Sequence, residues 1–283
     1  MKRAKDEQAT VGRDGPRTLA IDVGGTGIKA SVLNRAGRMT VKRVRVATPY
    51  PCRPATLLRA IMELTASLPP FDRISIGFPG VIRDGRVITA PHFDAKAWNN
   101  YALEQQISRR FGKPTRLLND AEVQGLGIVS GSGLEVVLTL GTGIGSAVFR
   151  NGQLAPHLEL AQHPIHKGKT YNDYVGNRAL LAQGSKKWSG RVLEMIEIVD
   201  SLLHYDVLYL GGGNAEKITV NLPKAVRTAS NDTGITGGIR LWDEEIWQIA
   251  RDRRTRGGKR AARMTAPSRR RAASPPARAA TPS

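Results

Sequence analysis

A strand–turn–strand segment occurs twice in this chain, and the repeat limits the folds that the chain can adopt. The first copy, residues 19–30, reads LAIDVGGTGIKA, and the second, residues 137–147, reads VLTLGTGIGSA. In each copy an apolar run enters a glycine and threonine turn and another leaves it, which predicts a β-hairpin. Glycine lets a bulky anion approach the backbone closely. The repeat therefore predicts a duplicated fold that holds a phosphate between its copies, and indicates nucleotide or polyphosphate chemistry.

Composition excludes several other classes of protein. With 283 residues, 40% hydrophobic and 24% charged, the chain resembles a globular protein with a substantial core. Its N-terminus is charged and lacks the apolar core of a signal peptide, and residues 136–149 are too few to span a bilayer. A single cysteine, Cys52, excludes an intramolecular disulfide and a cysteine-rich zinc site. We expect a cytoplasmic protein with no membrane partner.

The formal net charge of +19 is concentrated near the C-terminus. Residues 251–283 contain eleven lysine and arginine residues against one aspartate, and they are rich in alanine, proline and serine. This segment has no apolar period, which predicts a disordered tail. Two interpretations of the tail stay open: a solvated extension, or an electrostatic tether for polyphosphate, nucleic acid or an anionic membrane.

Strand and helix patterns alternate along the rest of the chain, which predicts an α/β fold with an antiparallel hairpin opening each half. The expected organisation is a flexible lead-in, two domains and the tail, with bounds 1–17, 18–121, 122–250 and 251–283. Among the expected elements are strands at 19–23, 28–33, 73–78, 135–140, 207–210 and 218–222, and helices at 55–68, 121–129, 180–184, 189–203 and 242–250. A ligand cleft is expected between the two domains.

The two glycine turns contain the candidate phosphate and metal ligands. Asp22 closes the first strand and is able to hold Mg²⁺ against phosphate oxygens. The turn residues expected to cradle the anion through their amides and hydroxyls are Gly24, Gly25, Thr26, Gly141, Thr142 and Gly143. Lys29 adds positive charge to this set, unless its side chain faces solvent. The alternative role of Asp22 is to cap the hairpin.

A second candidate site lies where a buried strand meets a helix, at Asn119 and Asp120. An aspartate in this position can accept the proton of an attacking sugar hydroxyl as a general base. The alternative is plain helix N-capping, for which Asn and Asp are common. A further turn, Gly211, Gly212 and Gly213, follows a strand and suits close backbone contact with a ligand.

Taken in order, these segments resemble the ROK sugar kinases of the actin/hexokinase/Hsp70 superfamily, and most nearly their polyphosphate/ATP glucokinase branch. The resemblance covers about residues 19–242. The segments that carry it read DVGGT from Asp22, GFPG from Gly77, LNDA from Leu118, LGTGIG from Leu140, LGGG from Leu210 and NDTGITGG from Asn231. Each is a weak signal alone, but their order and spacing are specific.

The resemblance implies two ribonuclease-H-like domains that close on a hexose. Asp120 would be the base on the sugar 6-hydroxyl, with Asn119, Glu159 and Gly80 on the sugar side. Phosphates would lie between the two hairpin turns, with Mg²⁺ near Asp22. A nucleotide base would lie near the triple-glycine turn, and related proteins are often homodimers.

The sequence departs from the family pattern on the sugar side. The Glu-x-Gly-His motif of the family becomes Glu159-Leu-Ala-Gln162-His163, so Gln162 stands where histidine is expected. Either His163 substitutes after a small shift, or Gln162 binds the sugar itself. The zinc site of many relatives cannot form with one cysteine. His157 and His166, outside any recognised cluster, are expected at the surface.

The function that follows is a sugar kinase, which phosphorylates the 6-hydroxyl of glucose or a similar hexose with polyphosphate, ATP or both, and Mg²⁺. Two alternatives stay open. One is a catalytically weak or silent sensor of sugar or polyphosphate, in which the tail would bind nucleic acid. The other is a transcriptional regulator, although such ROK proteins carry a helix-turn-helix domain ahead of the first phosphate motif, where this chain has only a short lead-in.

Overall fold

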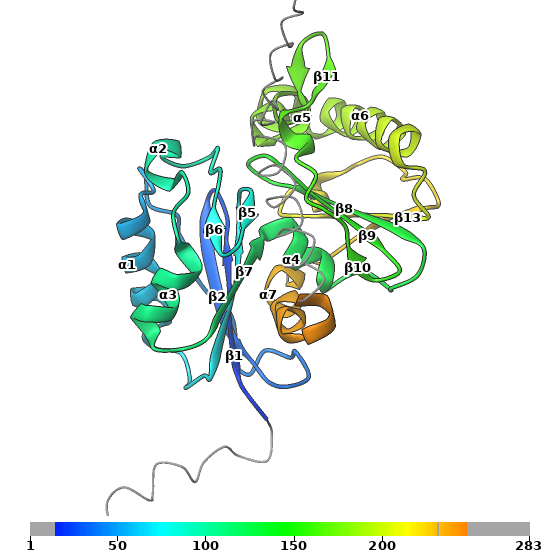
Figure 1. Ribbon diagram of the computed structural model, residues 1–283. Coiled ribbons are helices and arrows are strands. Elements are labelled where there is room, and N and C mark those ends of the chain that lie inside the picture. Colours follow the sequence, from blue (N-terminus) through cyan, green and yellow to red (C-terminus); the bar gives the residue numbers. More distant parts are fainter. Residues whose placement is uncertain (1–14, 231, 248–283) are drawn as a thin grey trace, which may run out of the picture.

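Two five-stranded sheets form the core of the fold in the computed structural model, which describes residues 15–230 and 232–247 (Figure 1). The first sheet has the order β3-β2-β1-β4-β7. Strand β1 pairs antiparallel with β2 and parallel with β4, which in turn pairs parallel with β7. The bounds of these strands are Thr18–Val23 (β1), Gly27–Leu33 (β2), Val44–Ala47 (β3), Arg73–Phe78 (β4) and Thr115–Asn119 (β7).

The second sheet repeats this topology with the order β10-β9-β8-β13-β14. Its antiparallel hairpin is β8–β9, and β13 and β14 add in parallel beyond β8. The bounds are Leu134–Leu140 (β8), Ile144–Arg150 (β9), Gln153–Leu154 (β10), Val207–Gly211 (β13) and Val226–Thr228 (β14). Because each sheet is an antiparallel meander followed by two parallel strands, the predicted duplication and its two hairpins are confirmed.

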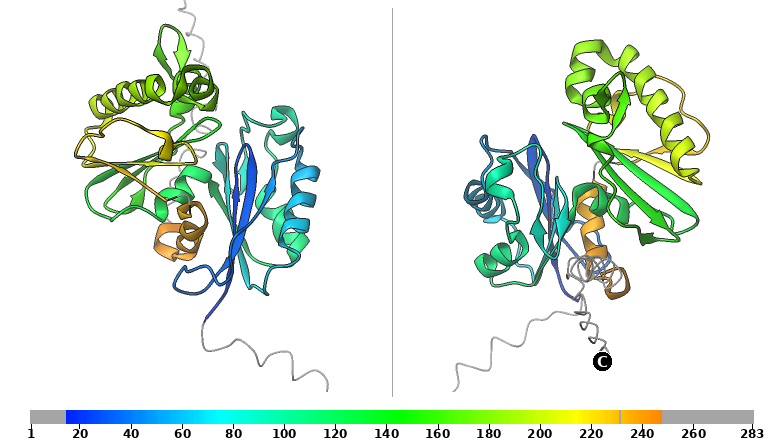
Figure 2. Two further views of the ribbon diagram at one scale, coloured as in Figure 1. Left: turned by 180° about the vertical axis from the view of Figure 1, so that it is seen from behind. Right: turned by 45° about the horizontal axis from the view of Figure 1, so that its top comes forward.

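Helices cover the outer faces of both sheets (Figures 1 and 2). The first sheet packs on α1 (Pro54–Thr65) and α3 (Leu103–Phe111), whose apolar residues join its core. The second sheet packs on α5 (Tyr171–Val175) and α6 (Asn177–Leu203). The smaller elements are β5 (Ile82–Arg83), β6 (Arg86–Val87), α2 (Ala95–Trp98), β11 (Pro164–His166), β12 (Lys169–Thr170) and the 3₁₀ helices Leu160–Gln162, Ala215–Lys217 and Gly237–Trp242.

Between the sheets lies α4 (Asp120–Leu126), accompanied by α7 (Thr233–Thr236). The chain returns here from the second sheet to the first. Ser75 Oγ on β4 donates to the Gly238 carbonyl at 2.6 Å, and Trp242 Nε1 donates to Ser75 Oγ at 2.8 Å. The C-terminal described segment thus packs on the first sheet as well as on α4. The boundary between residues 121 and 122 stays a prediction.

One local expectation differs from the structure. Residues 218–222 form no strand; Ile218 and Leu222 instead pack on the second core from a loop, so their apolar spacing reflects burial without pairing. The two helices expected at 180–184 and 189–203 are present as the two helical parts of α6, which are separated by a kink at Gly184, where φ is 73°. The helix expected at 242–250 falls partly outside the described residues, as the basic tail does entirely.

No helix within the described ranges is long and apolar enough to cross a membrane.

Candidate active site

A cleft of about 440 Å³ opens between the two sheets and collects most of the predicted site residues. Its lining comes from both hairpin turns, the start of α4 and the segment before the 3₁₀ helix Leu160–Gln162. The predicted residues that line it are Asp22, Gly25, Thr26, Lys29, Gly80, Asn119, Asp120, Gly141, Thr142, Gly143, Glu159, Gly212 and Gly213. Gly24, in the first turn, and Gly211, the last residue of β13, do not line it.

The two glycine turns face each other across the cleft. A Cβ atom on Gly25 would lie 2.9 Å from the Thr142 hydroxyl oxygen, so only glycine allows this approach without displacing the opposite turn. Each turn is closed by its own backbone: Gly24 N donates to Gly27 O at 2.9 Å, and Gly141 N donates to Gly143 O at 3.0 Å. The cleft thus places two sets of exposed turn atoms opposite one another, as an anion held between domains requires.

The third glycine turn packs directly beside the second. Gly212 has a φ of +82°, and a Cβ there would lie 2.5 Å from the Leu140 carbonyl oxygen, so a side chain is excluded both by conformation and by space. Asn214, one turn further, donates to the Gly141 carbonyl at 3.3 Å and to Asn177 Oδ1 at 3.2 Å. Backbone from β8 and β13 therefore meets at the same edge of the cleft.

Asp22 and Lys29 are cross-strand partners in the first hairpin. Lys29 Nζ lies 2.8 Å from Asp22 Oδ2, and the side chains are only 26% and 15% exposed respectively. Lys29 therefore points into the cleft, and the solvent-facing alternative is wrong. The pair engages one carboxylate oxygen of Asp22, a residue that also lines the cleft.

This carboxylate fits a Mg²⁺ ion of the phosphate-bound kind. Mg²⁺ keeps several waters and binds through one or two carboxylates together with substrate phosphates. Within residues 15–230 and 232–247 no cluster of three or more histidine, cysteine or acidic side chains has the arrangement of a metal site. A single carboxylate beside an anion turn is consistent with an ion that arrives with its phosphate, rather than with a cage built by protein alone.

Asn119 caps helix α4 through a capping box. Its Oδ1 accepts from the Ala121 and Glu122 amides, and the Glu122 carboxylate accepts from the Asn119 amide at 3.2 Å. Its side-chain Nδ2 donates to the Gly80 carbonyl at 3.1 Å, which joins β7 to the turn after β4. The N-capping alternative for Asn119 is therefore realised, while the residue also lines the cleft; its sugar contact stays a prediction.

Asp120 is the first residue of α4 and lies at the cleft. Burial raises the pKa of its carboxyl to about 7, with added repulsion from Asp22 and Glu159, while the Ala121 amide that donates to Oδ1 at 2.9 Å opposes the shift. A carboxylate with a pKa near neutrality is suited to accept a proton at physiological pH. Asp120 lines the same cleft as the two glycine turns, and its role as a base stays a prediction.

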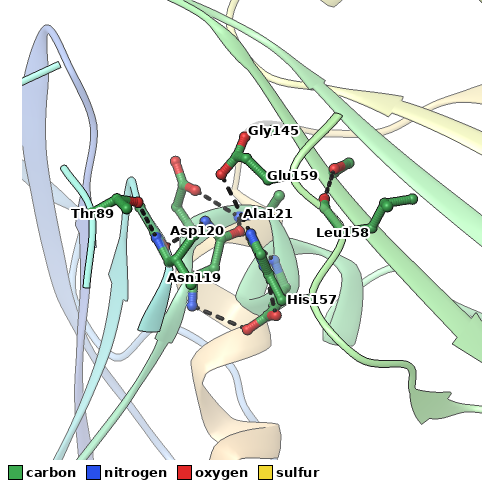
Figure 3. A network of polar contacts seen from close by, with 12 residues as sticks. Thr89, Asn119, Asp120, Ala121, Gly145, His157, Leu158 and Glu159 are labelled. Carbon is green, nitrogen blue, oxygen red and sulfur yellow. Dashed lines mark hydrogen bonds and ion pairs between the residues drawn. The ribbon is translucent and has the colours of Figure 1, made fainter. Parts of the chain in front are cut away.

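The imidazole beside Glu159 is His157, not a residue at 162 or 163 (Figure 3). Gln162 and His163 are exposed and do not line the cleft. The expectation that His157 lies at the surface is wrong: its side chain is 15% exposed, between Glu122 and Glu159. His166 is 40% exposed and pairs with Glu194, outside the cleft lining.

Other lining residues were not identified from the sequence. His92 comes from the loop after β6, and burial lowers its pKa while Glu159 opposes that shift. Arg43 and Arg45 extend the positive side of the cleft beside Lys29. Arg43 Nη1 pairs with Asp232 Oδ1 at 2.7 Å. Arg43 and Arg45 are two positions apart, so in an extended segment their side chains share one face. This spacing does not predict which ligand that face contacts.

Comparison with known proteins gives the same result as the motifs. A family model described as "ROK family" matches residues 18–156. The chain is 30% identical over 250 residues to a polyphosphate glucokinase of Mycobacterium tuberculosis, covering 81% of this chain and 91% of that protein. An inorganic polyphosphate/ATP-glucomannokinase from Arthrobacter sp. superposes with a TM-score of 0.73 at 28% identity, covering 83% and 99%.

A ROK family glucokinase from Streptomyces griseus, solved with glucose and AMPPNP, has the same fold at a TM-score of 0.64 and 19% identity, with 81% of this chain and 99% of that one covered. With its duplicated sheets, facing glycine turns and an aspartate at the head of the shared helix, the chain has the actin-like ATPase fold, and its relatives make it a phosphotransferase. Within that class the chain belongs to the ROK family.

Proposed function

We propose that this protein transfers a phosphoryl group to the 6-hydroxyl of glucose or a similar hexose, with polyphosphate, ATP or both as donor. The observation that carries the proposal is Asp120, which stands at the head of α4, lines the cleft and has a pKa raised to about 7. The named activities of the M. tuberculosis and Arthrobacter relatives support glucose and these donors.

In the proposed reaction the sugar lies in the cleft against Asp120, Glu159 and His92, whose ring also adjoins the second glycine turn at Gly143. Asp120 accepts the proton of the attacking hydroxyl, and the terminal phosphoryl group of the donor passes in line to the sugar oxygen. Carboxylates and amides match the sugar hydroxyls, and a sugar that left them unmatched would bind poorly. Closure of the two domains excludes water and favours transfer over hydrolysis.

Mg²⁺ would be held by Asp22, and it would neutralise charge on the donor phosphates. Lys29 keeps the Asp22 carboxylate in place through the 2.8 Å contact. The glycine turns, with Thr26 and Thr142, present the amides and hydroxyls for the transferred phosphate.

The positive side of the cleft favours a polyanionic donor. Lys29, Arg43 and Arg45 line the same cleft, and their positive charge matches a linear chain of phosphates without any recognition of a base, although Lys29 also pairs with Asp22 and Arg43 with Asp232. Gly212 and Gly213 line the same cleft, where an adenosine moiety would contact their backbone. We therefore expect dual use of donors, with polyphosphate preferred.

The test is a coupled assay of glucose 6-phosphate formation with glucose, Mg²⁺ and either donor, with mannose and N-acetylmannosamine as alternative acceptors. Product with either donor supports the proposal, and competition between donors sets their order. A folded sample that forms no product from any acceptor refutes it and favours the silent sensor. A variant that ends at residue 250 should keep its turnover on short donors, and light scattering tests the homodimer that the resemblance implies.

A further inference from the structure

A polar chain runs from the helix that carries Asp120 to the sugar side of the cleft. The Oε2 atom of Glu122, on α4, accepts a hydrogen bond from the Asn119 backbone amide at 3.2 Å. Its Oε1 atom lies 3.1 Å from His157 Nδ1. The other ring nitrogen, His157 Nε2, lies 3.4 Å from Glu159 Oε2 (Figure 3). One imidazole therefore lies between two carboxylates that belong to different segments.

This arrangement fixes the charge on the ring. A neutral imidazole has only one N–H, so one of its nitrogens would present a lone pair to a carboxylate oxygen. Only the imidazolium can donate to both Glu122 and Glu159. Burial by itself lowers the pKa of His157, but the hydrogen bonds and charges of these two glutamates outweigh it and raise the pKa to about 9.

Glu122, at one end of these polar contacts, is rigid, while Glu159, at the other end, lies at the cleft. Glu122 is 2% exposed and belongs to the capping box of α4, so its carboxylate has little freedom. Glu159 is 34% exposed and lines the cleft. A long acidic side chain at such a position loses rotamer freedom when it binds a ligand, unless a partner already holds it.

We infer that His157 is a positioning residue, a cationic clamp that holds the Glu159 carboxylate toward the sugar hydroxyls and ties it to the helix that carries the base. The inference rests on the proposed function. The charged and titratable groups that face the clamp are Glu122 from α4 and Glu159 from its own segment, and His92, across the cleft, faces Glu159 in turn.

If His157 holds Glu159 in this way, its loss should lower the affinity for glucose, which the loss of a purely structural histidine would not do selectively. Replacing His157 with Gln keeps one hydrogen bond but removes the charge. The KM for glucose should rise about ten-fold, because a hydrogen bond between charged groups is lost and Glu159 is left to reorient on binding. Turnover at saturating glucose and the KM for the donor should stay near wild-type. Glu122→Gln should show a smaller rise in the same direction.

The pH profile gives a second signature. Because the ring stays charged up to a pH of about 9, the KM for glucose should be flat between pH 7.5, where Asp120 is mostly ionised, and about pH 9, and should rise above that in the wild-type protein. The rise should be absent in His157→Gln. His166→Gln is the matched control, since His166 is 40% exposed, pairs with Glu194 and does not line the cleft.

The decisive experiment combines these kinetics with a ligand-free ¹⁵N NMR titration of the histidine rings, assigned by the signal that His157→Gln removes. Two protonated ring nitrogens at pH 7 and a ten-fold KM effect confined to glucose support the clamp. A ring that is neutral at pH 7, or product formation by His157→Gln with unchanged KM for glucose, overturns it. A wild-type protein that makes no product with any donor would instead refute the proposed function and, with it, the role toward sugar.

Discussion

The substitution Asp120→Asn should have opposite effects on turnover and on stability. The asparagine side chain is isosteric and its Oδ1 can still accept from the Ala121 amide, and the Asn119 cap of α4 is untouched. Loss of the base should lower turnover by about 10²–10⁴-fold. The same change removes a carboxylate whose ionised form burial disfavours, so the variant should be more stable than the wild type.

The sign and size of the stability change follow from the pKa of Asp120. A carboxyl group whose pKa is raised in the folded state contributes fully to the free energy of unfolding at pH values below its unfolded-state pKa. That stability is then lost as the pH rises from the unfolded value of 3.8 to about 7. The full shift corresponds to an upper limit of about 4 kcal/mol, and water at the cleft reduces it to about 2 kcal/mol. Above pH 7 the variant should therefore melt about 5 °C higher than the wild type.

The assay is thermal unfolding at pH 8 and pH 5, beside turnover at pH 8. At pH 5 the folded wild type is already protonated at Asp120, so the difference in Tm should shrink to about one third. Glu63→Gln, on the exposed face of α1, is the control for simple loss of a negative charge. Wild-type turnover in Asp120→Asn would refute its role as base, and a Tm difference that is absent at pH 8, or equal at both pH values, would refute the account of its burial.

Three further predictions concern the cleft. In the wild type, kcat/KM should fall about ten-fold per pH unit below a pH of about 7, as Asp120 becomes protonated, and a profile flat to pH 5 would contradict this. Gly25→Ala should lower kcat/KM about 100-fold by displacing the opposite turn, and steady-state kinetics that match wild type would show that the turns have room. The double variant Arg43→Gln and Arg45→Gln should weaken the binding of polyphosphate more than that of ATP and make polyphosphate binding less dependent on salt. The control Arg59→Gln, at an exposed position, should change neither. An equal loss of affinity for both donors would contradict a role of Arg43 and Arg45 in binding polyphosphate.

Much of the fold was predictable because it is encoded locally. The alternation of apolar residues around the two glycine turns predicted both hairpins, and each is present with the register of a tight antiparallel pair. Helix α1 followed from apolar residues at helical spacing, of which Leu57, Leu58 and Ile61 are buried. Residues 218–222 show the limit of this reasoning, since apolar alternation reports burial, and a loop laid over a core buries side chains as well as a strand does.

The candidate site was predictable to the extent that single residues have distinctive chemistry in a motif. Asp22, Asn119, Asp120 and Glu159 were identified in this way, and all line the cleft. His157 was misjudged because nothing near it in the chain reveals its partner. Glu122 lies 35 positions earlier and meets it only after α4 is placed between the sheets.

The sequence by itself determined the duplicated hairpins, the glycine turns and the acidic residue at the head of α4. These depend on backbone conformation and periodicity within a few residues of each other. Only the tertiary structure decided that Gly25 faces Thr142 and that Lys29 turns inward to Asp22. It also decided that His157 lies between the carboxylates of Glu122 and Glu159. Those contacts join segments far apart in sequence, and they exist because two sheets pack on one shared helix.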